Sequence, residues 1–135
     1  MTTLDTSVCI PALVSWHEHH EACRRAAVGA SVPAHVLAES FSVLTRLPAP
    51  HRLGGDVAGR LLARRFGPGD VLPASASLQR TAVAHLAGLG IEGGAVYDGL
   101  VGLTAKQHGQ RLITRDRRAA RTYALLEVDF ELVDS

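Results

Sequence analysis

Apolar residues recur at helical spacing along most of this chain, and short apolar runs separate the helical stretches. Residues 35–47 give the clearest pattern, with Leu37, Phe41 and Leu44 on the main apolar face and Pro48 after the last turn. The same spacing predicts further helices over 17–28, 56–66, 75–89, 95–109 and 116–126. We therefore expect a domain in which helices supply most of the regular structure.

Short apolar runs between these helices predict strands. They lie at Thr2–Leu4, Ser31–Pro33, Val71–Leu72, Arg111–Thr114 and Val128–Val133. The last run alternates apolar and polar residues, as an edge strand with one wet face does. Because short strands alternate with helices of ten or more residues, the pattern predicts an α/β fold with a mainly parallel sheet of four to five short strands.

The composition is that of a globular protein, and the net charge indicates no particular binding partner. The chain has 135 residues, of which 47% are hydrophobic and 20% charged, and its net charge is +1. These values predict one soluble globular domain over residues 1–135. The first residues contain no basic region followed by an apolar run, and no apolar stretch has the length of a membrane span, so we expect neither a secretion signal nor a membrane partner. Cys9 and Cys23 are expected to stay reduced.

Acidic residues occur where an α/β fold places its ligands. Asp5 follows the first strand and Asp116 follows the strand 111–114, and the carboxyl ends of parallel strands meet at one edge of a sheet. Glu39 and Asp98 lie near the starts of helices, with no lysine or arginine one helical turn away. Taken singly, Asp5 and Asp116 could be helix caps and Glu39 a surface acid. Four carboxylates meeting at one edge would need positive charge from an arginine, a backbone donor or a metal ion.

Four segments that contain these acids resemble the PIN-domain family, and within it the VapC-type toxins of bacterial toxin–antitoxin pairs. The segments are Leu4–Ser7, Val36–Glu39, Tyr97–Leu100 and Leu112–Arg118. Their order and spacing match over the whole chain, and the resemblance implies a three-layer α/β/α sandwich around the parallel sheet. Where some family members carry a further acid after the last motif, this chain has Arg117 and Arg118.

The resemblance implies an endoribonuclease toxin that hydrolyses phosphodiester bonds in tRNA, rRNA or mRNA with Mg²⁺ or Mn²⁺. Asp5, Asp98 and Asp116 would be the main metal ligands, directly or through water. Glu39 would orient or deprotonate the attacking water, or act as a further ligand. Carboxylate oxygens are the ligands that these hard cations prefer. The small hydroxyl residues Ser7 and Thr114 match supporting positions near the site.

The resemblance also implies partners. Arg115, Arg117 and Arg118 would hold the RNA backbone beside the metal. Their alternative role is a solvated helix start, or ion pairs to Glu127, Asp129 or Glu131. A cognate VapB-type antitoxin would occupy the cleft, and the toxin would form a homodimer in the bacterial cytoplasm.

Two other functions compete with this interpretation. A catalytically inactive PIN-like module would bind RNA or a protein, although the presence of all four acids argues against it. An aspartyl-phosphate phosphohydrolase would use Asp5 as its nucleophile. That class of phosphatase needs a second acid two residues further on, and Ser7 stands there instead.

The segment around residues 16–20 contains two features outside this scheme. His17 and His20 are expected on one helix face, where a zinc site is possible but a solvated face is the better interpretation. Trp16 is a large aromatic residue beside an apolar run, and core packing is its expected role, with a dimer contact as the alternative.

Overall fold

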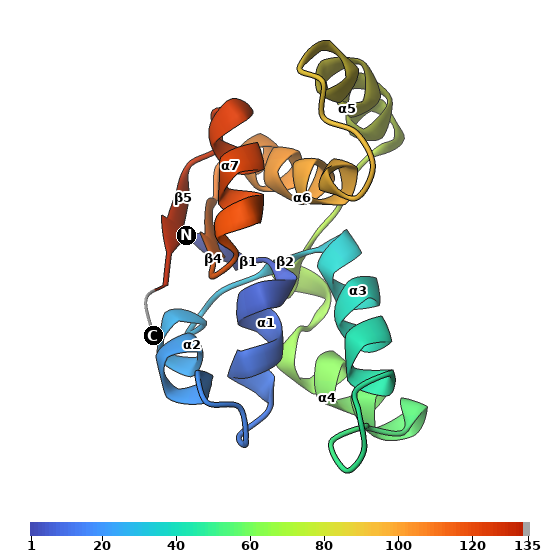
Figure 1. Cartoon of the computed structure of the whole chain (residues 1–135). Coiled ribbons are helices and arrows are strands. Elements are labelled where there is room, and N and C mark those ends of the chain that lie inside the picture. Colours follow the sequence, from blue (N-terminus) through green and yellow to red (C-terminus); the bar gives the residue numbers. More distant parts are fainter. Residues whose placement is uncertain (134–135) are drawn as a thin grey trace.

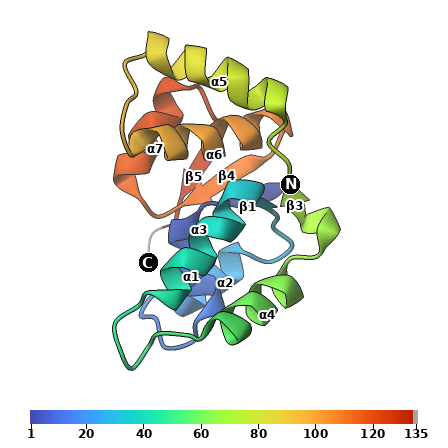
Figure 2. The same cartoon turned by 90° about the vertical axis from the view of Figure 1, so that its right-hand side faces the viewer.

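Short parallel strands lie between two layers of helices in the computed structural model, which describes residues 1–133 (Figures 1 and 2). The strands within this range are β1 (Thr2–Leu4), β2 (Val32–Pro33), β3 (Val71–Leu72), β4 (Arg111–Thr114) and β5 (Phe130–Leu132). They form two small sheets, ordered β1-β4-β5 and β2-β3. A parallel bridge between Thr3 and Ser31 joins the two sheets side by side. The prediction of an α/β fold with parallel strands is confirmed.

The helices divide between the two sides of the strands, which gives the three layers expected from the resemblance. One side carries α1 (Thr6–Leu13), α2 (His20–Ala26), α3 (Ala34–Thr45) and α4 (Gly55–Arg65). The other carries α5 (Ala76–Gly88), α6 (Ala95–Gln107) and α7 (Arg117–Leu125) (Figure 2). A 3₁₀ turn, Pro68–Asp70, precedes β3. Within residues 1–133, no helix is both long and apolar enough to cross a membrane.

The packing of α6 on α7 depends on a residue without a side chain. A Cβ atom added to Gly102 would lie 3.0 Å from Cδ1 of Tyr123 and 3.2 Å from Cγ2 of Val128. Because both neighbours are buried, a larger residue at this position would force the two helices apart. Glycine at position 102 therefore lets α7 pack close to α6. This packing places the Tyr123 side chain next to the ends of the strands.

The start of the chain differs from the predicted elements in a way that shapes the site. The helix expected over 17–28 begins only at His20, because residues 15–19 form turns and a bend. Helix α1 contains Pro11, which has no backbone N–H to donate to the carbonyl of Ser7 four residues earlier. Arg115 Nη1 donates to that carbonyl instead, at 3.5 Å. The interruption in α1 thus fixes the side chain of Arg115 beside it.

Candidate active site

The structure brings the four predicted acids together around one small cavity. Asp5, Glu39, Asp98 and Asp116 line a space of about 60 Å³, together with Val101 and Tyr123 among others. Asp5 directly follows β1, and Asp116 lies two residues beyond β4, its neighbour in the sheet. Helices α3 and α6 contribute Glu39 and Asp98 from opposite sides of the strands.

Asp5 is held by hydrogen bonds on both of its carboxylate oxygens. Oδ1 accepts from the backbone N–H of Ser7 at 3.1 Å and from its hydroxyl at 2.5 Å, so Asp5 is the N-cap of α1. Oδ2 accepts from the hydroxyl of Tyr123 at 2.9 Å. Only 5% of the Asp5 surface is exposed. These contacts fix the carboxylate at the bottom of the cavity.

The two predicted hydroxyl residues link Asp5 to the segment that carries Asp116. The Ser7 oxygen accepts from the backbone N–H of Arg115 at 2.8 Å and lies 3.3 Å from the hydroxyl oxygen of Thr114. Thr114 accepts in turn from the backbone N–H of Asp116 at 3.0 Å. The network holds the end of β4 in place relative to the start of α1.

Asp116 and Glu39 are less buried than Asp5. Oδ1 of Asp116 accepts from the backbone N–H groups of Arg118 at 2.9 Å and Ala119 at 3.1 Å, so this acid is the N-cap of α7. The side chain of Glu39 is 42% exposed, and Nε2 of His35 lies 3.7 Å from its Oε2. The capping role considered for Asp5 and Asp116 is therefore observed, and it coexists with their place in the cavity.

The clustered carboxylates shift one another's ionisation. Burial, together with the negative charges of Asp116, Asp5 and Glu39, raises the pKa of Asp98 to about 6. Burial also raises the pKa of Asp5, against the opposing effect of its hydrogen bonds. The pKa of Tyr123 lies far above its usual range because of burial and the Asp5 charge, so its hydroxyl remains a donor. Ionised together, these acids repel one another, and a cation bound among them would offset that repulsion.

The donor set fits a hard divalent cation that keeps part of its water shell. Within residues 1–133, Asp5, Asp98 and Asp116 form no ion pair. In the same range, no group of three or more His, Cys, Asp or Glu side chains has the arrangement of a preformed metal centre. Mg²⁺ usually binds through one or two carboxylates and several waters, so it does not need a closed protein cage. Unpaired carboxylates around a small cavity suit that kind of binding.

Arginines extend the site away from the acids. Arg115, Arg117, Arg118 and Arg121 line a larger cavity of about 450 Å³ together with Asp116. Two of the acids considered as ion-pair partners, Asp129 and Glu131, contact Arg111 instead, at 3.3 and 3.8 Å. The sequence interpretation did not include Arg121, although its position one turn after Arg117 and Arg118 on the helix could have indicated it.

Tyr123 is a site residue that the sequence interpretation missed. It lies in the apolar face of α7, where an aromatic residue is expected in the core, and it is fully buried. Its hydrogen-bond partner Asp5 lies 118 positions earlier in the chain. No local sequence signal reports a contact at that separation.

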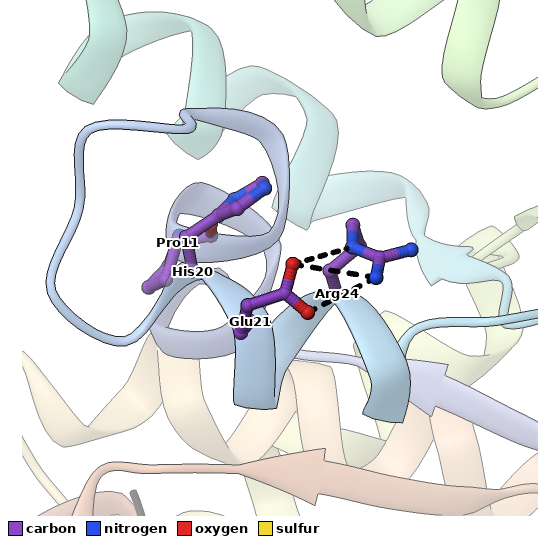
Figure 3. A network of polar contacts seen from close by, with 4 residues as sticks. All are labelled: Pro11, His20, Glu21 and Arg24. Carbon is purple, nitrogen blue, oxygen red and sulfur yellow. Dashed lines mark hydrogen bonds and ion pairs between the residues drawn. The ribbon is translucent and has the colours of Figure 1, made fainter.

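His17 and His20 do not share a helix face as expected, because α2 begins only at His20. His20 Nδ1 donates to the carbonyl oxygen of Pro11 at 2.8 Å, close to the Glu21–Arg24 ion pair (Figure 3). His17 Nδ1 instead accepts from the backbone N–H of His19, at 3.1 Å. The prediction of Trp16 as a core residue is wrong, since 46% of it is exposed.

Comparison with known proteins identifies close relatives. The family model of the PIN domain matches residues 2–125. Ribonuclease VapC40 of Mycobacterium tuberculosis is 45% identical over 134 residues, which are 98% of this chain and 99% of the relative. Among solved structures, the sarcin–ricin loop cleaving toxin VapC20 of Mycobacterium tuberculosis superposes with a TM-score of 0.71 at 19% identity, over 90% of this chain and 94% of the other. VapBC2 of Rickettsia felis bound to a promoter DNA fragment gives 0.67 at 15% identity, over 98% of each chain.

Proposed function

Because the chain belongs to the PIN-domain family and is a VapC-type ribonuclease toxin of a toxin–antitoxin system, we propose that Asp5, Glu39, Asp98 and Asp116 form its catalytic site and use Mg²⁺ or Mn²⁺. One observation carries this proposal: four carboxylates from four elements line one cavity, and burial and mutual repulsion raise the pKa of Asp98. A divalent cation is the partner that relieves both effects.

The residues divide the work according to their surroundings. Asp5, Asp98 and Asp116 supply oxygens to the ion, directly or through water. A bound Mg²⁺ or Mn²⁺ lowers the pKa of a coordinated water and polarises a phosphate oxygen. Glu39 is the acid with a half-exposed side chain on α3, and its carboxylate orients the attacking water and accepts its proton. Tyr123, Ser7 and Thr114 keep Asp5 and the end of β4 in position.

Removing divalent ions tests this function directly. We expect the purified chain to cut total bacterial RNA at defined sites with Mg²⁺ or Mn²⁺, and to leave it intact in excess EDTA. Readdition of Mn²⁺ should restore cutting, as end mapping by sequencing would measure. Calcium, which prefers more protein ligands and longer bonds, serves as the control ion. Cutting that persists in EDTA would contradict a metal-dependent site.

The arginine-lined cavity is the proposed path of the RNA backbone. Arg115, Arg117 and Arg118 belong to it, and Arg121 continues it along α7. Arginine side chains suit this role because they bind phosphate oxygens through several N–H groups at once. The position of Asp116 in the same cavity links the proposed backbone path to the acids.

Replacing one of these arginines should lower the affinity for RNA and should also make that affinity less dependent on salt. Arg118→Ala should lower kcat/KM for RNA several-fold at low salt, and should reduce the slope of log K against log[salt] by about 0.7, the value for one lost phosphate contact on a single strand. Filter binding in an inactive Asp98→Asn background measures the slope. Arg80→Ala, which removes an exposed arginine on α5, is the matched control. An equal effect of both variants would mean that only net charge matters.

The partners belong to the same proposal. We infer that a cognate VapB-type antitoxin neutralises the toxin by covering the acidic cleft, that the toxin is a homodimer, and that it acts in the bacterial cytoplasm. The similarity of VapBC2, a toxin–antitoxin complex, supports the first inference. End mapping of the cleaved total RNA would show whether the target is a tRNA, an rRNA or an mRNA.

A further inference from the structure

A second cavity, of about 360 Å³, adjoins the acids on the side of α1. Glu39 and Asp116 line both this cavity and the acidic one, so the two cavities lie side by side. Apolar side chains form part of its wall, and two nitrogen-bearing side chains complete it. The apolar residues are Ile10, Pro11 and Val43, and the nitrogen-bearing residues are His17 and Arg115. The cavity therefore combines apolar and polar groups directly beside the acids.

His17 presents a rigid ring to this cavity. Its Nδ1 accepts from the backbone N–H of His19 at 3.1 Å, which fixes the ring. Trp16 lies beside it, with ring centroids 6.1 Å apart, and stacks on His51 at 4.0 Å. The ring of His19 lies 5.6 Å away on the same segment. The neighbouring rings therefore pack behind His17, and these contacts hold the turn in place.

Arg115 places a positive charge in the same cavity. Its guanidinium is tied to the carbonyl of Ser7, which Pro11 leaves without a helical donor. Burial and the Arg115 charge both lower the pKa of His17, so the imidazole is neutral at pH 7. The cavity thus offers a cation beside the acids, a neutral aromatic face and an apolar wall. A nucleotide presents the complementary groups, since its phosphate is anionic and its base has a flat π-face.

We propose that this cavity binds the base of a nucleotide next to the scissile phosphate, with His17 as the stacking face and Ile10, Pro11 and Val43 as the apolar wall. The inference rests on the proposed function, because it takes the adjoining acids as the cutting site. An RNA base is favoured over a peptide side chain because the cavity places the Arg115 cation and the His17 ring beside the acids, where a nucleotide presents its phosphate and its flat base. The base would give this ribonuclease a preference at one position of its target.

The test combines a side-chain deletion with a base deletion. Synthetic RNA oligonucleotides spanning a mapped cleavage site are made intact, or abasic at one of the two nucleotides that flank the cut. His17→Ala should lower kcat/KM on the intact RNA about tenfold, within the range for a lost base–aromatic stack. His17→Phe, which keeps a ring, should stay near the wild type. For the wild type, kcat/KM on the abasic RNA should be about tenfold lower than on the intact RNA. For His17→Ala, the two RNAs should give nearly the same kcat/KM. His85→Ala, on the exposed face of α5, is the control and should cut like the wild type.

Three outcomes would overturn the base site. The first is equal cutting by His17→Ala and His85→Ala, and the second is an abasic RNA that slows the wild type and His17→Ala by the same factor. Alternatively, His17→Ala could cut normally but escape inhibition by the antitoxin, which would assign the cavity to a protein partner. In each of these cases the wild type still cuts with Mg²⁺ or Mn²⁺, so the proposed function survives. If the wild type cuts no RNA with either ion, the function fails and the base site falls with it. Thermal melts of each variant separate these outcomes from unfolding.

Discussion

Asp98→Asn should be more resistant to heat than the wild type in the absence of divalent ions, although it should cut RNA at least about a hundredfold more slowly. The loss of activity follows because an amide oxygen is neutral and holds Mg²⁺ or Mn²⁺ less well than a carboxylate does. The gain in stability follows because the carboxylate of Asp98 is ionised at neutral pH in a place that disfavours its charge. Catalysis and stability thus make opposite demands on this side chain.

The sign of the pH dependence follows from the direction of the shift. The pKa of Asp98 rises from 3.8 to about 6 in the folded chain, so the folded state binds a proton more tightly than the unfolded state does. The penalty on folding is absent below pH 4, grows as the pH rises towards 6, and is complete above that. Because the carboxylate is only half-buried, we discount the penalty for solvent screening to about 1–2 kcal/mol. Asparagine removes it at every pH.

Thermal unfolding in EDTA at pH 5 and pH 8 measures this effect. The difference in Tm between Asp98→Asn and the wild type should be a few degrees and larger at pH 8. Mg²⁺ should raise the Tm of the wild type and change that of the variant less. Asp56 is an exposed acid in the first turn of α4, and Asp56→Asn is the control. Its Tm should not rise above that of the wild type. An active Asp98→Asn variant would remove the basis for the metal site.

The site acids could be placed from the sequence because their positions depend on local rules. Asp5 and Asp116 come after short apolar runs, and parallel strands bring such positions to one edge. Glu39 and Asp98 could be identified because no lysine or arginine lies one helical turn away on either helix. Their convergence on one cavity needed only the order of the elements and the family resemblance.

The residues that were missed depend on contacts between distant segments. Tyr123 resembles any core aromatic residue on an amphipathic helix until Asp5 is seen at its hydroxyl. Trp16 was expected inside because it follows an apolar run, but the chain turns before α2 and the ring stacks on His51 instead. Helix α1 itself was not predicted, since Pro11 lies within it. Each of these outcomes is decided by tertiary packing, which spacing along the chain does not report.

Asp116 has two roles that two substitutions should separate. Its Oδ1 accepts two backbone N–H groups at the start of α7, while the acid also lines the cavity shared by the four acids. Asn is as good an N-cap as Asp, so Asp116→Asn should fold with nearly the wild-type stability but cut RNA at least about a hundredfold more slowly. Asp116→Ala should lose the same activity and also about 1 kcal/mol of stability, the usual cost of a lost cap.

Urea unfolding and RNA cleavage assays on the same preparations provide both measurements. Ser75→Ala is the matched control, because Ser75 caps α5 through its hydroxyl at 3.0 Å from the backbone nitrogen of Leu78 and lies in none of the cavities near the acids. It should lose a similar amount of stability and keep full activity. If Asp116→Asn also kept full activity, Asp116 would be a cap alone, and the metal would depend on Asp5, Glu39 and Asp98. Loss of activity in Asp116→Asn with an unchanged urea midpoint instead requires the negative charge itself, because the cap, the helix and the buried Tyr123 on it would all be intact.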